Sequence, residues 1–470
     1  MEMTQSQPEA RVHLAHPALA MLGLMIGAFV GMFSETALNI ALPSLMATLH
    51  VTPGTVQWLV TGYMLVIGIC MPLSSLLARR FATKRIVSVA LGAFMVGALI
   101  DATATTFPLV LAGRMVQGVG TGLVLPLMFA VAMQIFPPHK LGTVMGLAAL
   151  VIMFAPAIGP TLTGLLLATA SWHAVFWVFV PLLALALGLT LLALDDVYPR
   201  TDAPIDWWSV TLSTLGFGGL VVGVSLAADR GWRSWPVLGA LIIGGLALIT
   251  FSRRQLRQSP PMLNLRVFTR PAFTTGMLLV MLDFGVILAT MYLLPTYLQT
   301  TMGLPVALCG LAMLPGGLVN ALVSALAGRL FDRYGAHWLT RGGFALAALG
   351  LGVLLYSDAT SPLAVVILGH VILMIGAPLA MSPAQTYALN ALDGPLSADG
   401  SAVLNTAQQI VGACATAIAT SLLALGTHQH MGQLGQTVGI HFGFWFALAL
   451  TGLAFGLAWR IQAPSQPAGQ

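Results

Sequence analysis

The sequence has few charged residues: Asp, Glu, Lys and Arg make up only 7% of its 470 residues. In an average soluble domain about a quarter of the residues are charged. Hydrophobic residues account for 58% of the chain, which is more apolar surface than a soluble fold could cover. The scarcity of charge therefore excludes a soluble globular protein and predicts a polytopic membrane protein.

Cysteine is equally scarce. Cys70, Cys309 and Cys414 lie in separate apolar segments far apart along the chain, so we expect small core residues and neither a disulfide framework nor a metal site. The N-terminal stretch MEMTQSQPEARVHLAHP lacks a basic leader followed by a short apolar core. We therefore expect the first apolar segment to be retained and not cleaved as a signal peptide.

Long apolar runs fill the rest of the chain. A helix needs about 20 apolar residues to cross a bilayer, and fourteen segments reach that length. We predict an all-α fold whose fourteen transmembrane helices lie near residues 18–43, 55–78, 86–106, 108–134, 142–168, 172–194, 206–228, 235–252, 272–298, 306–329, 339–357, 362–387, 401–425 and 440–460.

The Lys and Arg residues outside these helices lie almost entirely on one side of the membrane. Arg230 and Arg233 are the exceptions. Cytoplasmic loops are enriched in Lys and Arg, so we place both termini in the cytoplasm and the chain in the lipid bilayer of a bacterial inner (cytoplasmic) membrane. The net charge of +5 then reflects topology and gives no reason to expect nucleic-acid binding. The residues placed inside are Arg79, Arg80, Lys84, Arg85, Lys140, Arg253, Arg254, Arg257, Arg266, Arg270, Arg329, Arg333, Arg341 and Arg460.

Two cytoplasmic loops, 195–206 and 252–271, divide the helices into groups of six, two and six. The stretches LSSLLARRFATKR (73–85) and LAGRLFDRYGAHW (326–338) each follow the second helix of a six, which favours an internal repeat. We predict five parts: a cytoplasmic tail (1–17), an N-terminal six-helix bundle (18–194), two additional helices with their loops (195–271), a C-terminal six-helix bundle (272–460) and a cytoplasmic tail (461–470).

When charged residues at the helix ends are assigned to the loops, four remain inside the predicted helices: Glu35, Asp101, Arg114 and Asp283. Such groups cost several kcal/mol unless they are paired or hydrated, and they typically mark ion or substrate paths. A buried carboxyl group can also bind and release a proton near neutral pH. We predict that Glu35 and Asp283 bind protons or a cationic substrate; the alternative is a structural hydrogen bond to a neighbouring helix.

Arg114 and Asp101 fall at similar depths on neighbouring helices. We predict that Asp101 takes part in proton coupling. The two residues could instead pair directly with each other, and Asp101, near a helix end, could simply be solvated.

Four stretches resemble a known family. RMVQGVGTG (114–122) matches the fourth-helix pattern of major facilitator transporters, APAIGPTLTG (155–164) resembles their fifth-helix antiporter pattern, and GRLFDRYG (328–335) resembles their loop motif. GMFSETALNIALP (31–43) is similar to the first-helix signature of fourteen-span drug:proton antiporters, with Ser34 at the usual aspartate position and Glu35 one residue later. We expect Glu35 to replace that aspartate.

This resemblance covers nearly the whole chain and implies a major facilitator fold, with two six-helix bundles and two extra central helices. It implies no enzyme activity but proton-coupled efflux of hydrophobic, often cationic drugs or dyes by alternating access. The resemblance implies no cofactor, with a proton gradient as the energy source. The implied partners are small-molecule substrates and protons. The resemblance is also compatible with a periplasmic adaptor. The resemblance also implies that Arg114 faces the cavity and interacts with the protonatable carboxyl groups, which gives it a role in proton coupling. The residues with implied conformational roles are Arg114, Gln117, Gly118, Pro156, Gly159, Pro160, Gly164, Gly328, Asp332 and Arg333.

The predicted substrate site combines polar and apolar side chains around a central cavity. Asn39 lies one turn from Glu35 on the same helix face, and the resemblance places Trp58 and Tyr63 on a cavity-facing helix. The full set is Met32, Phe33, Glu35, Asn39, Trp58, Tyr63, Phe154 and Tyr292.

Two other functions stay open. The same helices and carboxyl groups would serve an exporter of one physiological metabolite. An integral-membrane redox enzyme would need facing pairs of histidines for a haem, whereas the ten histidines are scattered and His370 is the clearest one within a predicted helix.

Overall fold

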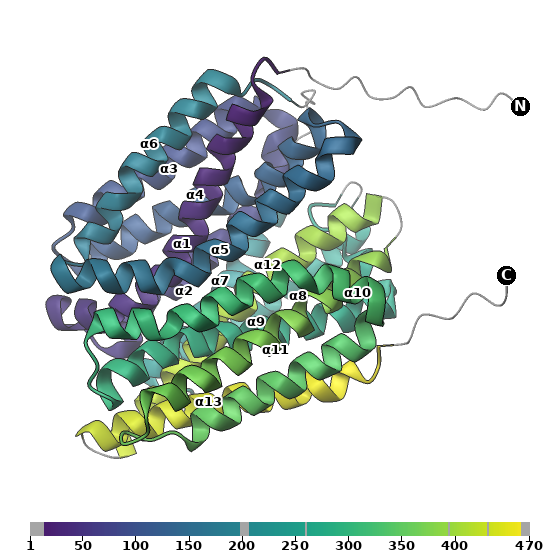
Figure 1. Cartoon of the computed structure of the whole chain (residues 1–470). Coiled ribbons are helices and arrows are strands. Elements are labelled where there is room, and N and C mark those ends of the chain that lie inside the picture. The colour runs from purple at the N-terminus through teal and green to yellow at the C-terminus, as the bar shows by residue number, and fades with distance from the viewer. Residues whose placement is uncertain (1–13, 198–205, 259–260, 393–394, 430–431, 462–470) are drawn as a thin grey trace, which may run out of the picture.

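The computed structural model describes residues 14–197, 206–258, 261–392, 395–429 and 432–461. Every regular element in this part of the chain is a helix (Figure 1). The α-helices are α1 (Pro17–Leu49), α2 (Pro53–Arg80), α3 (Thr83–Thr103), α4 (Phe107–Ile135), α5 (Pro138–Thr169), α6 (His173–Ala193), α7 (Trp207–Arg230), α8 (Trp235–Arg257), α9 (Pro271–Thr296), α10 (Val306–Tyr356), α11 (Leu363–Asn390), α12 (Pro395–Gln429) and α13 (Gly432–Ala458). Two short helices are η1 (Leu265–Thr269) and η2 (Tyr297–Thr301).

Fourteen helical segments in the described residues are long and apolar enough to cross a membrane, which confirms the predicted number. Thirteen α-helices contain them because α10 holds two, Val306–Phe331 and Arg333–Tyr356. The helix is broken at Gly335, where φ is 71°. Glycine adopts this left-handed conformation without steric cost, so the last glycine of the GRLFDRYG stretch serves the turn between two spans.

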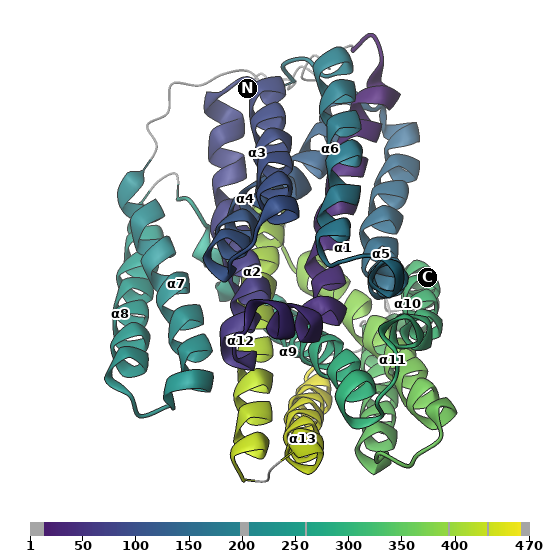
Figure 2. The same ribbon diagram turned by 90° about the vertical axis from the view of Figure 1, so that its left-hand side faces the viewer.

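The helices form two large groups that touch along a seam. Figure 1 shows α1–α6 on one side and α9–α13 on the other. Across the seam α5 packs against α10, α2 against α12, and α1 against α9. Figure 2 shows α7 and α8 beside α2 and α12; α7 contacts both of these helices, and α8 packs against α7.

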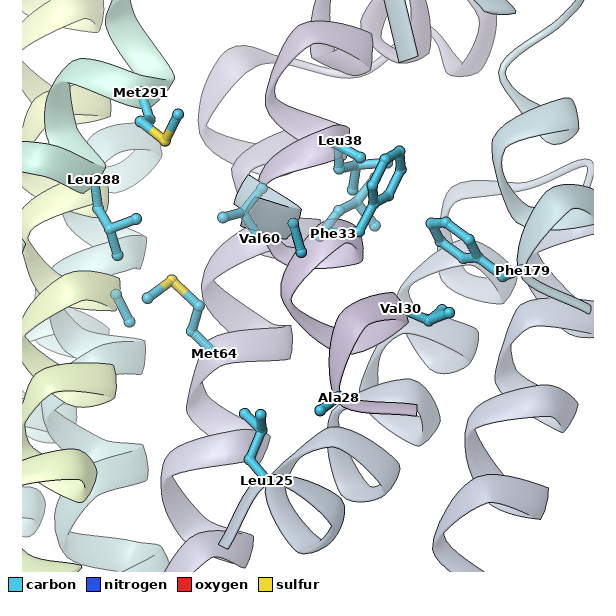
Figure 3. Close-up of a cluster of buried hydrophobic side chains, with 14 of the residues drawn as sticks. Ala28, Val30, Phe33, Leu38, Val60, Met64, Leu125, Phe179, Leu288 and Met291 are labelled. Atoms are coloured by element: carbon cyan, nitrogen blue, oxygen red, sulfur yellow. The ribbon is translucent and has the colours of Figure 1, made fainter. Parts of the chain in front are cut away.

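Buried apolar side chains fill the seam. In Figure 3, Met64 of α2 points toward Leu288 of α9, near Met291. All three side chains are at most 7% exposed. On the far side of α1, Phe33 meets Phe179 of α6 edge-on, with 5.7 Å between ring centroids. One helix, α1, therefore borders both the seam and the interior of the first group.

Candidate functional site

Glu35 lies in α1 and is 2% exposed. The side-chain amide of Gln409 in α12 approaches its carboxylate. The second carboxylate oxygen, Oε2, is buried without a hydrogen-bond partner. The one carboxyl group of the α1 signature therefore lies at the seam, where helices of the two groups meet, and retains an unused acceptor.

Arg114 of α4 is completely buried. Its Nε donates a hydrogen bond to the Leu59 carbonyl oxygen at 3.0 Å. Its guanidinium also donates to the Oγ and the carbonyl oxygen of Ser34. The guanidinium carbon lies 3.9 Å from the centroid of the Tyr63 ring, within the range of a cation–π contact. These contacts hold the cation in one orientation.

Ser34 and Glu35 consequently make different interactions from adjacent faces of α1. Ser34, at the usual aspartate position, contacts Arg114. Glu35 is rotated by about 100° around the helix, interacts with Arg114 electrostatically and is approached by Gln409 of α12. That Glu35 replaces the aspartate of the signature therefore stays a prediction.

Gln117 joins Arg114 to Asp101 of α3. Its Oε1 accepts a hydrogen bond from Arg114 Nη1 at 2.9 Å, and its Nε2 donates one to Asp101 Oδ2 at 2.6 Å. None of the ion pairs described in the structure joins Arg114 directly to Asp101. Direct pairing was therefore wrong, because the amide of Gln117 stands between the two charges.

Asp101 is also not solvated, contrary to the second alternative, since its side chain is fully buried. Gly113 of α4 makes the room: a Cβ at that position would lie 2.0 Å from Asp101 Oδ1. That oxygen has no hydrogen-bond partner. Close packing of α3 on α4 therefore removes from water a carboxyl group that lies near a helix end.

The result is a buried polar network with one guanidinium and two carboxyl groups, Arg114, Glu35 and Asp101. Arginine keeps its proton in proteins. The three groups together carry a single negative charge when both carboxyl groups are ionised, and none after one proton binds. Such a network can exchange a proton for a cationic group without a net change of buried charge.

Asp283 of α9 forms a separate feature. It is fully buried, and neither carboxyl oxygen has a hydrogen-bond partner. Leu279, Val280 and Val286, about one turn away along α9, are buried and apolar. An unpaired carboxylate is costly in such surroundings, so Asp283 is a second candidate for proton binding, although no described contact links it to Glu35.

The predicted substrate-binding side chains are not all in one place. Tyr63 is fully buried, and its hydroxyl group is bonded to the Gly31 carbonyl oxygen and Thr121. Tyr292 is 3% exposed and lies near Thr420. Trp58 and Met32 are half-buried, and Phe154 is 40% exposed. Asn39 is buried with its Oδ1 unpartnered, which makes it an available polar group one turn from Glu35.

Phe33 lies away from the seam. It lines an apolar cavity of about 360 Å³ between α1, α5 and α6. The lining residues are Phe29, Val30, Phe33, Leu162, Leu165, Leu166, Val178, Phe179 and Leu182.

The APAIGPTLTG stretch lies in the part of α5 that packs against α10. Thr161 Oγ1 donates a hydrogen bond to the Gly310 carbonyl oxygen at 2.8 Å. A Cβ at Gly164 would lie 2.8 Å from the Val306 carbonyl oxygen. A Cβ at Gly310 would lie 2.8 Å from the Pro160 carbonyl oxygen. Backbone therefore meets backbone here, as small residues permit between membrane helices.

The other motif residues lie in three places. Gly159 of α5 lies against Thr36 of α1, and Pro156 is also in α5. Gly118 lies against the backbone of α2 at Tyr63. In the loop stretch, Gly328 has open space around it and Arg333 is exposed, while the side chain of Asp332 is outside the described part.

Sequence reasoning missed Gln409. It falls in the polar run NTAQQ (405–409) within an otherwise apolar segment, a signal that a count of charged residues does not detect. No group of three or more His, Cys, Asp or Glu side chains among the described residues is placed to hold a metal ion.

Residues 24–416 match the family model described as the Major Facilitator Superfamily. The chain is 45% identical over 448 residues to the lincomycin resistance protein LmrB of Bacillus subtilis (strain 168), covering 92% of this chain and 94% of that protein. It is 44% identical over 424 residues to the protein of the same name from Listeria monocytogenes serovar 1/2a, covering 90% of each. It is 29% identical over 393 residues to a multidrug resistance protein B homolog of Mycobacterium tuberculosis (strain ATCC 25618 / H37Rv), covering 83% and 73%.

Solved structures show the same fold. The xylose transporter XylE from E. coli, in a partially occluded inward open conformation, superposes with a TM-score of 0.65 at 16% identity, covering 97% of this chain and 100% of that one. A POT family transporter in complex with 5-aminolevulinic acid gives 0.68 at 16% identity, covering 92% and 94%.

Proposed function

Since this chain belongs to the major facilitator superfamily, and is thus a membrane transporter and not an enzyme, we propose that it exports drugs in exchange for protons. Its relatives are named for resistance to lincomycin and to multiple drugs. These names support antibiotics of the lincomycin kind as substrates, together with other hydrophobic and often cationic compounds.

The observation that carries proton coupling is the buried carboxylate of Glu35, with one unpartnered oxygen at the seam between the helix groups. A carboxylate held only for structure would be fully hydrogen-bonded, because an unsatisfied buried polar atom costs about 1–3 kcal/mol. Asn39 adds a free acceptor one turn away. These two unused acceptors suit a ligand that brings donors: a proton, or the cationic group of a drug.

Charge balance then supplies the exchange. The single negative charge of the network of Arg114, Glu35 and Asp101 can be neutralised by either a proton or a cation. Binding of one therefore weakens binding of the other. A neutral drug lacks this direct competition, and its exchange for a proton depends on the conformational change.

The conformational change is alternating access, in which bundles 18–194 and 272–460 rock about the seam. In the proposed inner-membrane orientation, with cytoplasmic termini, Ile40 and Thr161 lie in the outward halves of their helices. Here Gln299 Nε2 donates to the Ile40 carbonyl oxygen at 3.1 Å and Thr161 donates to the Gly310 carbonyl oxygen at 2.8 Å. These contacts close the outward side, and the opposite state has to break them.

Transport by the purified protein in proteoliposomes tests the proposal. With an acidic lumen, wild-type protein should accumulate lincomycin or ethidium, Glu35→Gln should not, and Asp358→Asn, which alters an exposed carboxyl group, should match the wild type. Wild-type accumulation without a pH gradient, or full activity of Glu35→Gln, would contradict the proposal. In a host lacking its own pumps, protection against a single compound would instead favour a dedicated metabolite exporter.

A further inference from the structure

Gln409 reaches the proposed proton site from the opposite helix group. It lies in α12, is 5% exposed, and its side-chain amide approaches the carboxyl group of Glu35 in α1. Gly68 of α2 lies against the same turn of α12: a Cβ at that glycine would crowd Ile410 Cδ1 at 2.9 Å and would make an ordinary contact with Gln409 Cβ at 3.5 Å. The side chain of Gln409 therefore lies against α2 and near Glu35 of α1, while its backbone belongs to the other group.

The unused atoms of this pair are complementary. Glu35 Oε2 and Gln409 Oε1 are both buried without a hydrogen-bond partner. An ionised carboxylate only accepts hydrogen bonds, so it uses the N–H of the amide. A protonated carboxyl group gains an O–H donor, for which the free Oε1 of Gln409 is a ready acceptor. The pair can therefore form one hydrogen bond when Glu35 is ionised and a second when it is protonated.

The other titratable or charged groups that act on Glu35 come from its own helix group. Arg114 of α4 interacts with it electrostatically, as does Tyr63 of α2. Both are held by contacts inside that group, to Ser34 and to the Gly31 carbonyl oxygen. In this set Gln409 alone lies on the other side of the seam.

We propose that Gln409 is the positioning residue through which the second helix group responds to the protonation state of Glu35. This inference rests on the proposed proton-coupled export. It adds the residue that links the protonation state of Glu35 to the second helix group. Protonation of Glu35 adds a hydrogen bond between the side chains of Glu35 and Gln409 and so favours the conformation in which Gln409 reaches Glu35. Loss of the proton weakens that preference.

The experiment compares Gln409→Leu with Gln408→Leu in proteoliposomes. Gln408 is the matched control because it is the same residue type on the same helix and is 6% exposed. Two rates are measured with ethidium: accumulation driven by an acidic lumen, and exchange at equal pH on both sides. We expect the ratio of driven to undriven transport to fall about tenfold in Gln409→Leu, which corresponds to about 1.4 kcal/mol of lost coupling. The control should keep the wild-type ratio.

A reversed pair provides the second arm. Glu35→Gln combined with Gln409→Glu moves the carboxyl group to α12 and the amide to α1, so driven transport should return to a measurable level that neither single variant reaches. If Gln409→Leu does not fold, Gln409→Asn, whose shorter amide retracts from Glu35, is measured in the same way. An unchanged ratio in Gln409→Leu or Gln409→Asn would overturn the inference. A wild-type protein that shows no driven transport would instead overturn the proposed function.

Discussion

Replacement of Gly164 by alanine should shift the protein away from the conformation described here. The added Cβ would lie 2.8 Å from the Val306 carbonyl oxygen and 3.2 Å from the Cα of Gly310. Both are backbone atoms, which cannot rotate away as a side chain can, so α5 and α10 have to separate. Overpacking of this kind costs about 1–3 kcal/mol, which changes a two-state ratio by roughly 5- to 150-fold.

Gly146→Ala is the control for this substitution. It lies on the same helix, and its new Cβ would meet nothing within 4 Å. The readout is the distance between spin labels at Leu147 of α5 and Leu326 of α10, which are 50% and 49% exposed, in a protein whose native cysteines have been replaced. We expect Gly164→Ala, and not Gly146→Ala, to enlarge a population with a shorter distance, because the proposed rocking motion brings the bundles together at this end. Identical distance distributions for the two variants would refute the packing argument.

Two further predictions concern charged groups. Arg114→Lys should reduce proton-driven transport by about tenfold or more. A single ammonium group cannot replace the planar guanidinium, which hydrogen-bonds with Leu59, Ser34 and Gln117 at once. Unchanged driven transport in proteoliposomes would contradict this prediction. Outside the membrane, Asp206 caps α7: partial burial opposes its ionisation, but hydrogen bonds from Arg254 and Ser209 outweigh it and hold the pKa of this carboxyl group well below its usual range. The stabilisation of the folded protein by ionised Asp206 is therefore fully present above about pH 4 and is lost as the pH falls toward the lowered pKa. The difference in Tm between wild type and Asp206→Asn should consequently shrink in acid. A difference that stays constant from pH 7 to pH 3 would contradict this prediction.

The number and type of elements could be predicted because the bilayer imposes both. A chain in hydrocarbon has to satisfy its backbone hydrogen bonds within each helix, so each apolar run of sufficient length becomes one span. The break in α10 was also visible, since Gly335 ends a recognisable loop stretch and has the positive φ that its position requires.

The contacts of the site could not be predicted, because they depend on which helix faces are brought together. Ser34 and Glu35 are adjacent in sequence, yet Ser34 hydrogen-bonds with Arg114 of α4, whereas Glu35 is approached by Gln409 of α12. The partner of Glu35, Gln409, comes from far along the chain and carries no charge to attract notice. Asp101 looks exposed from its place near a helix end, but the missing side chain of Gly113 lets α4 cover it.

The central claim is that a drug and a proton compete for Glu35. The most direct measurement is proton release when ethidium binds to the detergent-solubilised protein in weakly buffered solution near neutral pH, followed with a pH-sensitive dye. Competition predicts that wild-type protein releases protons on binding and that Glu35→Gln binds ethidium without releasing them. Equal proton release by the wild type and Glu35→Gln would contradict the claim, as would binding to the wild type with no release at any pH between 6 and 8.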